Sequence, residues 1–225
     1  MLKHPVFIIV LLLFSLPLLG QERETDVGGI FSVQLNKDLN KRTAISLDEE
    51  VRLLSNNTGF ERFTSGVGIE YNIIKKLKAG VFYNFMYMYN NNFLYEIRHR
   101  YYVNLSYKQK IDRKISLTWR TRFQGTNRDE TKGEYKTNPK YVLRNKLEAD
   151  YNIPGSRWKP YFSVEATNSM NDPLGNEIYR LRFQGGTNWR LDKTNYLEFF
   201  VRWDEYIVMP DPRVVSIGVG YIAKF

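Results

Sequence analysis

The sequence contains no cysteine, and after residue 20 it has one histidine, His99. Without cysteine, the chain has neither a disulfide framework nor thiolate ligands for a metal. After residue 20 it also lacks a helical stripe of apolar residues and an apolar run of the roughly 20 residues that a transmembrane helix needs. The sequence therefore excludes a disulfide-stapled domain and does not predict a bundle of membrane helices.

Residues 1–20 are the exception to this pattern. They combine a basic start, an apolar run, a break at Pro17 and a small residue, Gly20. This order is that of a secretory signal peptide, so we expect cleavage before Gln21 and export of residues 21–225. The alternative is an uncleaved membrane anchor, for which the apolar run is short. No cysteine follows the signal, which excludes a lipoprotein.

Charge and aromatic content further limit the class of protein and its partners. Aromatic residues make up 15% of the chain and hydrophobic residues 43%, which excludes an intrinsically disordered protein. The formal net charge is +9, and a basic surplus can serve nucleic-acid binding. Since we expect an exported chain, we predict no nucleic-acid partner. The positive charge is then available for anionic lipid head groups, such as lipopolysaccharide phosphates, or simply for solvent.

Beyond Gln21, apolar residues recur at every second position in run after run. One run, residues 77–89, places on one face Leu77, Ala79, Val81, Tyr83, Phe85, Tyr87 and Tyr89. A period of two predicts strands. The runs exceed the roughly 5–6 residues of ordinary strands and suit the roughly 9–11 residues with which a tilted strand crosses a bilayer.

We count eleven such runs. Bacterial single-chain barrels normally have an even number of strands, so we expect ten or twelve and favour twelve. Residues 31–35 and 43–54 form the first two runs, and one of them would then be split, shortened or outside the membrane.

The connectors between the runs alternate in length. Short turns occupy residues 73–78, 108–114, 153–157 and 190–195. Longer polar stretches occupy residues 125–139, 168–177 and 208–213. Short turns on one side and longer loops on the other are typical of an outer-membrane barrel. Nothing reads as a linker or a second domain, so we expect one barrel domain over residues 21–225.

Two architectures share this alternation. A soluble β-sandwich or lipocalin-like barrel hides its apolar face inside, whereas a membrane barrel turns it towards lipid. The apolar face carries so many aromatic side chains that they would crowd an ordinary interior. Aromatic residues also lie towards the strand ends, as in the girdles of membrane barrels; they are Tyr83, Tyr87, Tyr89, Tyr95, Trp158, Trp189 and Trp203. We therefore predict an all-β, transmembrane, antiparallel up-and-down β-barrel in the bacterial outer membrane.

The last strand, residues 215–225, has apolar residues at alternate positions and ends on Phe225. It resembles the C-terminal signature of Gram-negative outer-membrane barrels, which the barrel-assembly machinery recognises. The resemblance implies an assembly signal that includes Tyr221 and Phe225, and it implies this machinery as a partner.

The polar faces of the strands are densely charged. We count nine acidic and ten basic residues on them, and arginine outnumbers lysine. Guanidinium groups bind carboxylates in two-pronged pairs and hold rigid networks. We expect cross-strand arginine–carboxylate networks that largely close the lumen, built from Glu50, Arg52, Glu70, Glu96, Arg98, Arg100, Arg120, Arg122, Arg144, Glu148, Glu165, Arg180, Arg182, Glu198 and Arg202. The alternative is a narrow channel whose charges select the solute.

The sequence offers little for catalysis. His99 has the lipid-facing parity at which outer-membrane lipid hydrolases place serine and histidine, and Ser65 and Thr121 are the nearest candidate nucleophiles. We expect instead a structural histidine and no catalytic residue. One histidine, together with carboxylates that have arginine neighbours, predicts no metal site, and we expect no cofactor. Gly185–Gly186 lies within a strand and predicts a bend or bulge rather than a phosphate loop.

Several of these runs together resemble the family catalogued as domain of unknown function 2490. The resemblance extends over residues 28–225 and rests on His99-Arg100, the R-x-R of Arg120 and Arg122, the strand residue Glu165, and the R-x-R-F of Arg180, Arg182 and Phe183. It implies an outer-membrane β-barrel of a Gram-negative, Bacteroidetes-type bacterium and carries no established activity.

We therefore expect a non-catalytic outer-membrane barrel with a structural, assembly or envelope-maintenance role. Its expected partners are outer-membrane lipid, lipopolysaccharide, the assembly machinery and an envelope protein complex. The alternatives are a narrow charge-lined channel or transporter for small solutes, and an outer-membrane lipid hydrolase that uses His99.

Overall fold

The computed structural model describes residues 25–54, 59–89, 95–128, 137–173, 175, 177–207 and 213–225. The expected signal peptide and its cleavage site lie outside the described residues, as do parts of the longer connectors.

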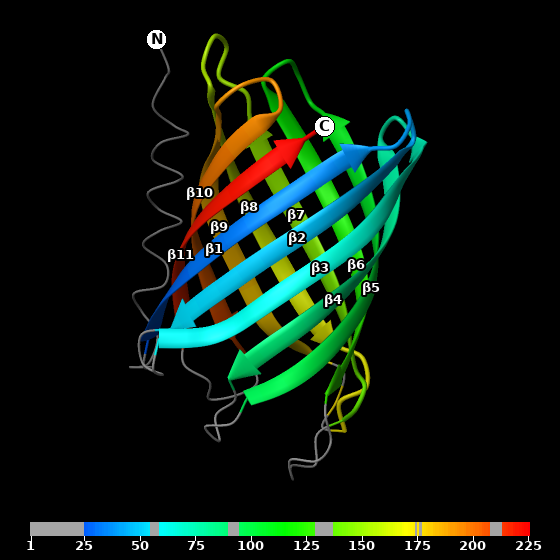
Figure 1. Ribbon diagram of the computed structural model, residues 1–225, viewed down its shortest axis with the longest axis vertical. Coiled ribbons are helices and arrows are strands. Elements are labelled where there is room, and N and C mark those ends of the chain that lie inside the picture. Colours follow the sequence, from blue (N-terminus) through cyan, green and yellow to red (C-terminus); the bar gives the residue numbers. More distant parts are fainter. Residues whose placement is uncertain are drawn as a thin grey trace.

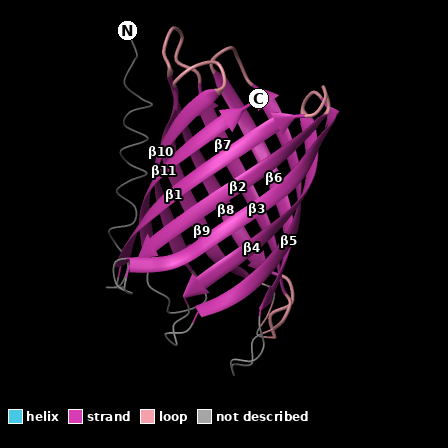
Figure 2. Cartoon of the chain, viewed as in Figure 1, coloured by secondary structure: helices cyan, strands magenta, loops and turns pink. Residues whose placement is uncertain are grey.

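Eleven strands form a closed barrel, and the described part of the chain consists of strands and their connections (Figure 1, Figure 2). In chain order they are β1 (Thr25–Asp38), β2 (Thr43–Leu54), β3 (Gly59–Ile74), β4 (Leu77–Tyr89), β5 (Tyr95–Lys110), β6 (Ile115–Arg128), β7 (Lys140–Tyr151), β8 (Trp158–Ser169), β9 (Ile178–Arg190), β10 (Asn195–Tyr206) and β11 (Arg213–Lys224). None of the described residues belongs to a helix long and apolar enough to span a membrane.

Each strand pairs antiparallel with the next one along the chain, from β1–β2 to β10–β11. The barrel closes where β1 pairs parallel with β11, from Thr25 opposite Arg213 to Asn36 opposite Lys224. The two strands lie side by side and point the same way in Figure 1. The expectation of ten or twelve strands in a wholly antiparallel barrel is therefore wrong for the described chain.

The odd number of strands has a simple cause. The first two runs are neither split nor shortened, because β1 has 14 residues and β2 has 12. When successive strands alternate in direction, the first and the eleventh run the same way, so that only parallel hydrogen bonds can join them. A parallel pair is slightly less stable per residue, but it removes both free edges. Closure thus does not require an even number.

The short turns lie at one end of the barrel with the C-terminus, and the strand ends that the longer connectors join lie at the other, as predicted (Figure 1). We refer to these as the turn end and the loop end. In three short turns, a side-chain oxygen of Asn40, Asp112 or Asp192 accepts hydrogen bonds from the backbone N–H groups two and three residues later. Such Asx turns fix the hairpin. The side chain of Asn195 and the backbone N–H groups of Thr194 and Asn195 lower the pKa of Asp192 to about 2.

Apolar side chains cover the outside of the barrel, and polar side chains line its inside. Val81 is 59% exposed and Ile217 is 62% exposed, whereas Glu165 is 2% exposed and Asp204 is 4% exposed. This is the reverse of the order in a soluble protein. The soluble lipocalin-like alternative requires an apolar interior and does not describe this barrel.

Aromatic side chains gather near both ends of the outer wall. Near the loop end, the ring of Tyr95 stacks on that of Tyr87 with 5.0 Å between centroids, and Tyr89 packs edge-on against Tyr95. Near the turn end, Trp158 stacks on Trp189 with 5.4 Å between centroids. These positions agree with the predicted girdles.

Of two other residues predicted for the girdles, Trp203 lies near a strand end and Tyr83 does not. Trp203 lies near the loop end of β10, where its indole Nε1 donates to Glu205 at 3.1 Å. Tyr83 is the seventh of the 13 residues of β4, so it lies in the middle of the wall, and its hydroxyl is 2.7 Å from His99 Nδ1. The girdle prediction is wrong for Tyr83, because alternation identifies the face of a strand and not the depth along it.

A phenylalanine ring inside the barrel requires glycines beside it. A Cβ atom at Gly218 would come within 2.0 Å of the Phe200 ring, and one at Gly186 within 2.8 Å of Phe200 Cβ. The register of β9 continues without a shift through Gly185 and Gly186. The register therefore contains no bulge at this pair, and Gly186 makes room for a neighbouring side chain.

Candidate functional site in the lumen

Side chains from ten strands extend into the lumen. A cavity of about 400 Å³ lies among them and is lined by residues of β1 to β10. All fifteen residues predicted for the network alternate with the outer-wall residues, so the structure places them on the inner wall.

Glu165 in β8 binds arginines from three other strands. Its Oε1 accepts hydrogen bonds from Arg144 Nη2 at 2.6 Å and Arg144 Nε at 3.0 Å, and its Oε2 accepts one from Arg120 Nη2 at 3.1 Å. Arg182 Nη1 lies 4.0 Å from Oε1. Charge-assisted hydrogen bonds of this kind are stronger than neutral ones. One buried carboxylate thus connects β6, β7 and β9 to β8.

Asp204 in β10 extends this cluster. Arg182 donates from Nε to Oδ1 at 2.6 Å and from Nη2 to Oδ2 at 3.0 Å, which is a two-pronged pair. Arg180 Nε lies 3.8 Å from the same Oδ1. Asp204 and Glu165 therefore join five consecutive strands, β6 to β10, through a cross-strand network of the predicted kind.

Two pairs of network residues lie within a single strand. Arg52 Nε donates to Glu50 Oε1 at 2.7 Å, and Arg98 donates to Glu96. Residues two apart in a strand point to the same face, and an arginine is long enough to reach back to such a neighbour. The network therefore combines pairs within a strand with the predicted cross-strand pairs.

Glu198 is held by neutral partners. The Tyr161 hydroxyl donates to Glu198 and accepts a hydrogen bond from Gln184 Nε2 at 2.6 Å. Gln184 Oε1 in turn accepts from Arg202 Nε at 2.9 Å. Sequence reasoning missed Tyr161 and Gln184. Their parity marks them as lumen residues, but no sequence signal marks them as partners of Glu198.

Arg122 lies on aromatic rings and has no carboxylate partner among the described residues. Its guanidinium lies 3.8 Å above the centroid of the Tyr102 ring, which stacks on Phe82 with 4.8 Å between centroids. Arg122 Nε donates to Asn104 at 2.8 Å. The Phe82 ring lies against Gly68, where a Cβ atom would come within 2.0 Å of it. A cation–π contact positions the arginine without neutralising it.

Two predicted acids pair with lysines that the prediction did not name as their partners. Lys78 Nζ lies 2.9 Å from Glu70, and Lys146 Nζ lies 2.6 Å from Glu148. Both pairs lie in the turn-end half of their strands. The lumen is therefore more basic than the nine acids and ten bases counted from the sequence, because residues such as Lys78 also face inwards.

The outer wall does not bring Ser65 and His99 together. Ser65 Oγ donates to Glu49 at 2.7 Å. Phe85 of β4 stands opposite Ser65 on one side and opposite His99 on the other, so a whole strand separates the two. Thr121, the other candidate nucleophile, bonds to a β7 side chain. Within the described ranges, no three His, Cys, Asp or Glu side chains form a metal-binding group.

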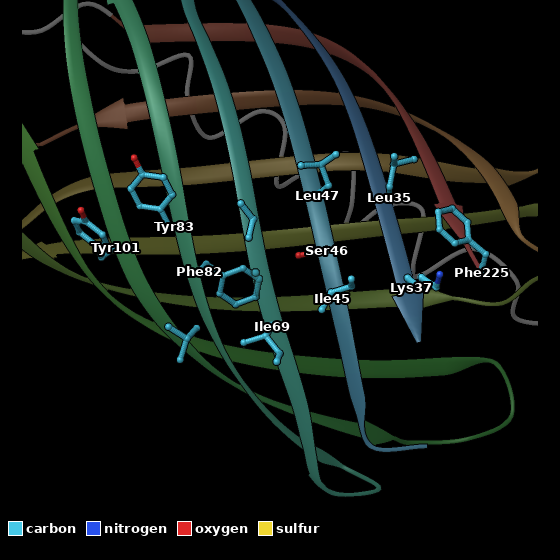
Figure 3. A pocket seen from close by; sticks show the side chains of 13 residues that line it. Leu35, Lys37, Ile45, Ser46, Leu47, Ile69, Phe82, Tyr83, Tyr101 and Phe225 are labelled. Atoms are coloured by element: carbon cyan, nitrogen blue, oxygen red, sulfur yellow. The ribbon is translucent and has the colours of Figure 1, made fainter. Parts of the chain in front are cut away.

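A groove of about 660 Å³ runs along the outer wall towards the turn end. Figure 3 shows Phe225 on one side of it, Tyr83 and Tyr101 on the other, and Ile45 and Leu47 between them. Phe225, of the predicted assembly signal, is 63% exposed. The lining is mostly apolar, so this groove forms part of the apolar wall.

The sequence profile of the family described as "Protein of unknown function (DUF2490)" matches residues 28–205. The chain belongs to the DUF2490 family. The match begins in β1 and ends in β10, so it spans less of the chain than the expected 28–225. Arg120, Glu165 and Arg182, which carry the DUF2490 resemblance in the sequence, meet in one ion-pair cluster.

Comparison with curated proteins gave no match. Among solved structures, the chain is similar to one titled "CymD monoaromatic hydrocarbon channel", with a TM-score of 0.44 and 10% sequence identity. The alignment covers 76% of this chain and 66% of that one, so this chain spans just under two thirds of that protein's length.

Proposed function

We propose that this protein is an outer-membrane β-barrel with a non-catalytic structural, assembly or envelope-maintenance role. The observation that carries the proposal is the inverted polarity of a closed barrel, apolar outside and charged inside. In water, such a wall would exceed by far the few hundred Å² of contiguous apolar surface that soluble proteins tolerate. Strands of 12 to 16 residues are long enough to cross a bilayer.

The cross-linked lumen supports a structural role over free diffusion of solutes. Ion pairs around Glu165 and Asp204 connect five strands across the interior, beside a cavity of about 400 Å³. Such a network stiffens the wall and obstructs passage. This role includes contact with lipopolysaccharide and membership of an envelope complex, for which co-purification from detergent extracts is the direct assay.

The membrane location is tested with Trp119, which lies on the outer wall and is 54% exposed. The mature chain is refolded into lipid vesicles. We expect lipids brominated in their acyl chains to quench the tryptophan fluorescence strongly and aqueous iodide to quench it weakly. A folded chain that is freely soluble in buffer without detergent would contradict the proposal.

The absence of catalysis is supported by the separation of Ser65 from His99. A histidine general base must reach the nucleophile's hydroxyl, and Phe85 stands between them. We expect lipid hydrolysis by the purified barrel to stay at the background rate, with no change in a His99→Ala variant. Turnover that disappears in His99→Ala would establish the hydrolase instead.

A narrow channel for small solutes is the second candidate, favoured by the remaining cavity and by lumen arginines that lack a carboxylate. Planar-bilayer recording separates the two candidates. The structural role predicts no conductance steps above background. Reproducible steps with anion selectivity would favour the channel.

A further inference from the structure

Four arginines surround one carboxylate in the lumen. Arg52, Arg62, Arg100 and Arg202, from β2, β3, β5 and β10, line the same cavity as Glu50. Arg52 Nε donates to Glu50 Oε1 at 2.7 Å, and Arg62 Nη2 lies 3.9 Å from the same oxygen. These four side chains therefore bring more positive charge to the cavity than Glu50 can balance.

The other acids that line the cavity do not remove this excess. The lining contains nine arginine and lysine residues against six aspartate and glutamate residues, of which Asp48 is one. Glu61 Oε1 lies 3.7 Å from Arg62 Nη2, so it is a second, distant partner of one arginine. The two-pronged hydrogen bonds of Asp204 go to Arg182. The cavity lining thus keeps a net positive charge.

Several hydrogen-bond donors of these arginines have no acceptor among the described residues. Arg62 Nε and Arg202 Nη1 are buried and make no hydrogen bond. Arg100 donates once, to Thr126 at 3.3 Å, and no carboxylate of the described chain lies within ion-pair distance of it. Arg62 and Arg122 line the same cavity as Arg100. Buried donors without acceptors cost free energy, so a native structure needs an explanation for them.

The arginines around Glu165 have charged hydrogen-bond acceptors, so the shortage of acceptors does not affect every lumen arginine. Arg120, Arg144 and Arg182 share Glu165 and Asp204, and each of them makes at least one charge-assisted hydrogen bond. The same barrel therefore gives the arginines around Glu165 charged acceptors, whereas Arg100 and Arg202 donate to the neutral side chains of Thr126 and Gln184. An anionic ligand could supply the acceptors that these two arginines lack.

We propose that the lumen binds a small oxyanion of the phosphate class between Arg62, Arg100 and Arg202, with Arg52 and Glu50 at its edge. Guanidinium groups bind phosphate oxygens in two-pronged pairs, and a dianion would offset two of the three positive charges that Glu50 leaves. A cavity of about 400 Å³ admits a small ligand only. The inference rests on the lumen of the proposed barrel and not on its membrane location, so a test in detergent separates the two.

The test compares the detergent-folded barrel in inorganic phosphate and in chloride at equal ionic strength and neutral pH. We expect phosphate to raise the unfolding temperature in a saturable manner, because a ligand that binds only the folded state stabilises it. We expect Arg100→Gln and Arg62→Gln each to weaken phosphate binding by about tenfold or more in titration calorimetry. The matched control Lys159→Gln removes a lumen cation near the turn end and should change the affinity by less than about twofold.

Loss of phosphate binding by misfolding is distinguished from loss of the site. Arg100→Gln removes a charge that has no carboxylate partner in the described chain and shares its cavity with Arg62 and Arg122, so in chloride this variant should unfold at the same temperature as the parent or a higher one. A purely structural Arg100 would instead leave the variant less stable in both salts, with an unchanged response to phosphate.

A second probe separates the two sources of such an anion. Glycerol 3-phosphate that binds about tenfold tighter than inorganic phosphate would identify a phosphomonoester, as in a head group, and equal or weaker binding would identify the free ion. The proposal is overturned if phosphate stabilises no more than chloride. It is also overturned if Lys159→Gln weakens binding as much as Arg100→Gln, since the attraction would then be general and not a site.

Discussion

Replacement of Glu165 with glutamine tests whether the lumen network holds the barrel together. Glu165 is 2% exposed and accepts three hydrogen bonds from Arg144 and Arg120. Glutamine keeps the shape of the Glu165 side chain. Its amide NH2 group, however, takes the place of one carboxylate oxygen, so that hydrogen-bond donors face the donors of a guanidinium group. Breaking a buried ion pair by removing one partner costs about 3–5 kcal/mol. Because Arg182 keeps Asp204, we expect the lower part of this range, about 3 kcal/mol.

The assay is urea unfolding of the barrel in lipid vesicles, followed by tryptophan fluorescence. The matched control is Glu148→Gln, since Glu148 pairs with one lysine, Lys146, and its side chain is 27% exposed. A partly exposed pair of this kind contributes up to about 1 kcal/mol. If Glu165→Gln lowers the free energy of unfolding no more than Glu148→Gln does, the ion pairs do not hold the strands and the reasoning is refuted.

The remaining predictions concern a glycine, a turn and the last residue. Gly218→Ala forces the Phe200 ring to move and should cost about 1–3 kcal/mol in urea unfolding, whereas Gly29→Ala, whose Cβ would meet its nearest neighbour at 3.6 Å, should change little; equal costs would contradict the close-contact argument. The pKa of Asp192 is about 2, so its carboxylate stabilises the turn above about pH 4, and this contribution is lost as the pH falls towards 2. Asp192→Asn should therefore remove that part of the acid dependence of unfolding, and an unchanged acid profile would exclude it. Deletion of Phe225 should reduce insertion by the assembly machinery in cells and leave folding into vesicles unchanged; impaired vesicle folding would indicate a structural role.

The face of each strand could be predicted because the wall separates two different environments. Neighbouring residues such as Trp119 and Arg120 must lie on opposite faces of a strand. Once one residue is assigned to a face, the faces of its neighbours follow. The short turns were equally predictable, since Asp112 and Asp192 can bond the backbone of their own turns. Strand faces and Asx turns both depend on residues close together in the sequence, so the sequence alone is enough to predict them.

The number of strands could not be predicted, because closure is a property of the two ends together. Alternation assigns a face to each residue of β1 and β11 but says nothing about whether the strands pair parallel or antiparallel. The even-number rule was the only guide, and it fails here because the register from Thr25 to Asn36 provides a full parallel ladder. The alternation also does not show how deep in the wall a residue lies, which is why Tyr83 was wrongly assigned to a girdle.

The partners within the lumen were hidden for a related reason. Arg100 and Arg144 have the same parity and similar neighbours in the sequence, yet Arg144 makes two hydrogen bonds to Glu165 and Arg100 makes none to a carboxylate of the described chain. The difference depends on strand register and on the reach of each side chain across the lumen. Register and reach are determined only in the assembled barrel. The sequence therefore predicts which residues face the lumen, but not which of them form ion pairs or hydrogen bonds with one another.

Two lysines and two arginines of the lumen lie at different levels, and this follows from their chemistry. Lys108 and Lys159 pair with Asp150 near the turn end, and their side chains are 46% and 40% exposed. Arg144 and Arg182 pair further inside, each with 11% exposure. An ammonium group keeps its water at the rim, whereas a guanidinium group can exchange its water for several fixed acceptors. An ion that enters from the turn end therefore meets lysines first and then arginines. Whether the lumen is closed or conducts, this order of charges repels cations, so cation-selective current is incompatible with either proposed function.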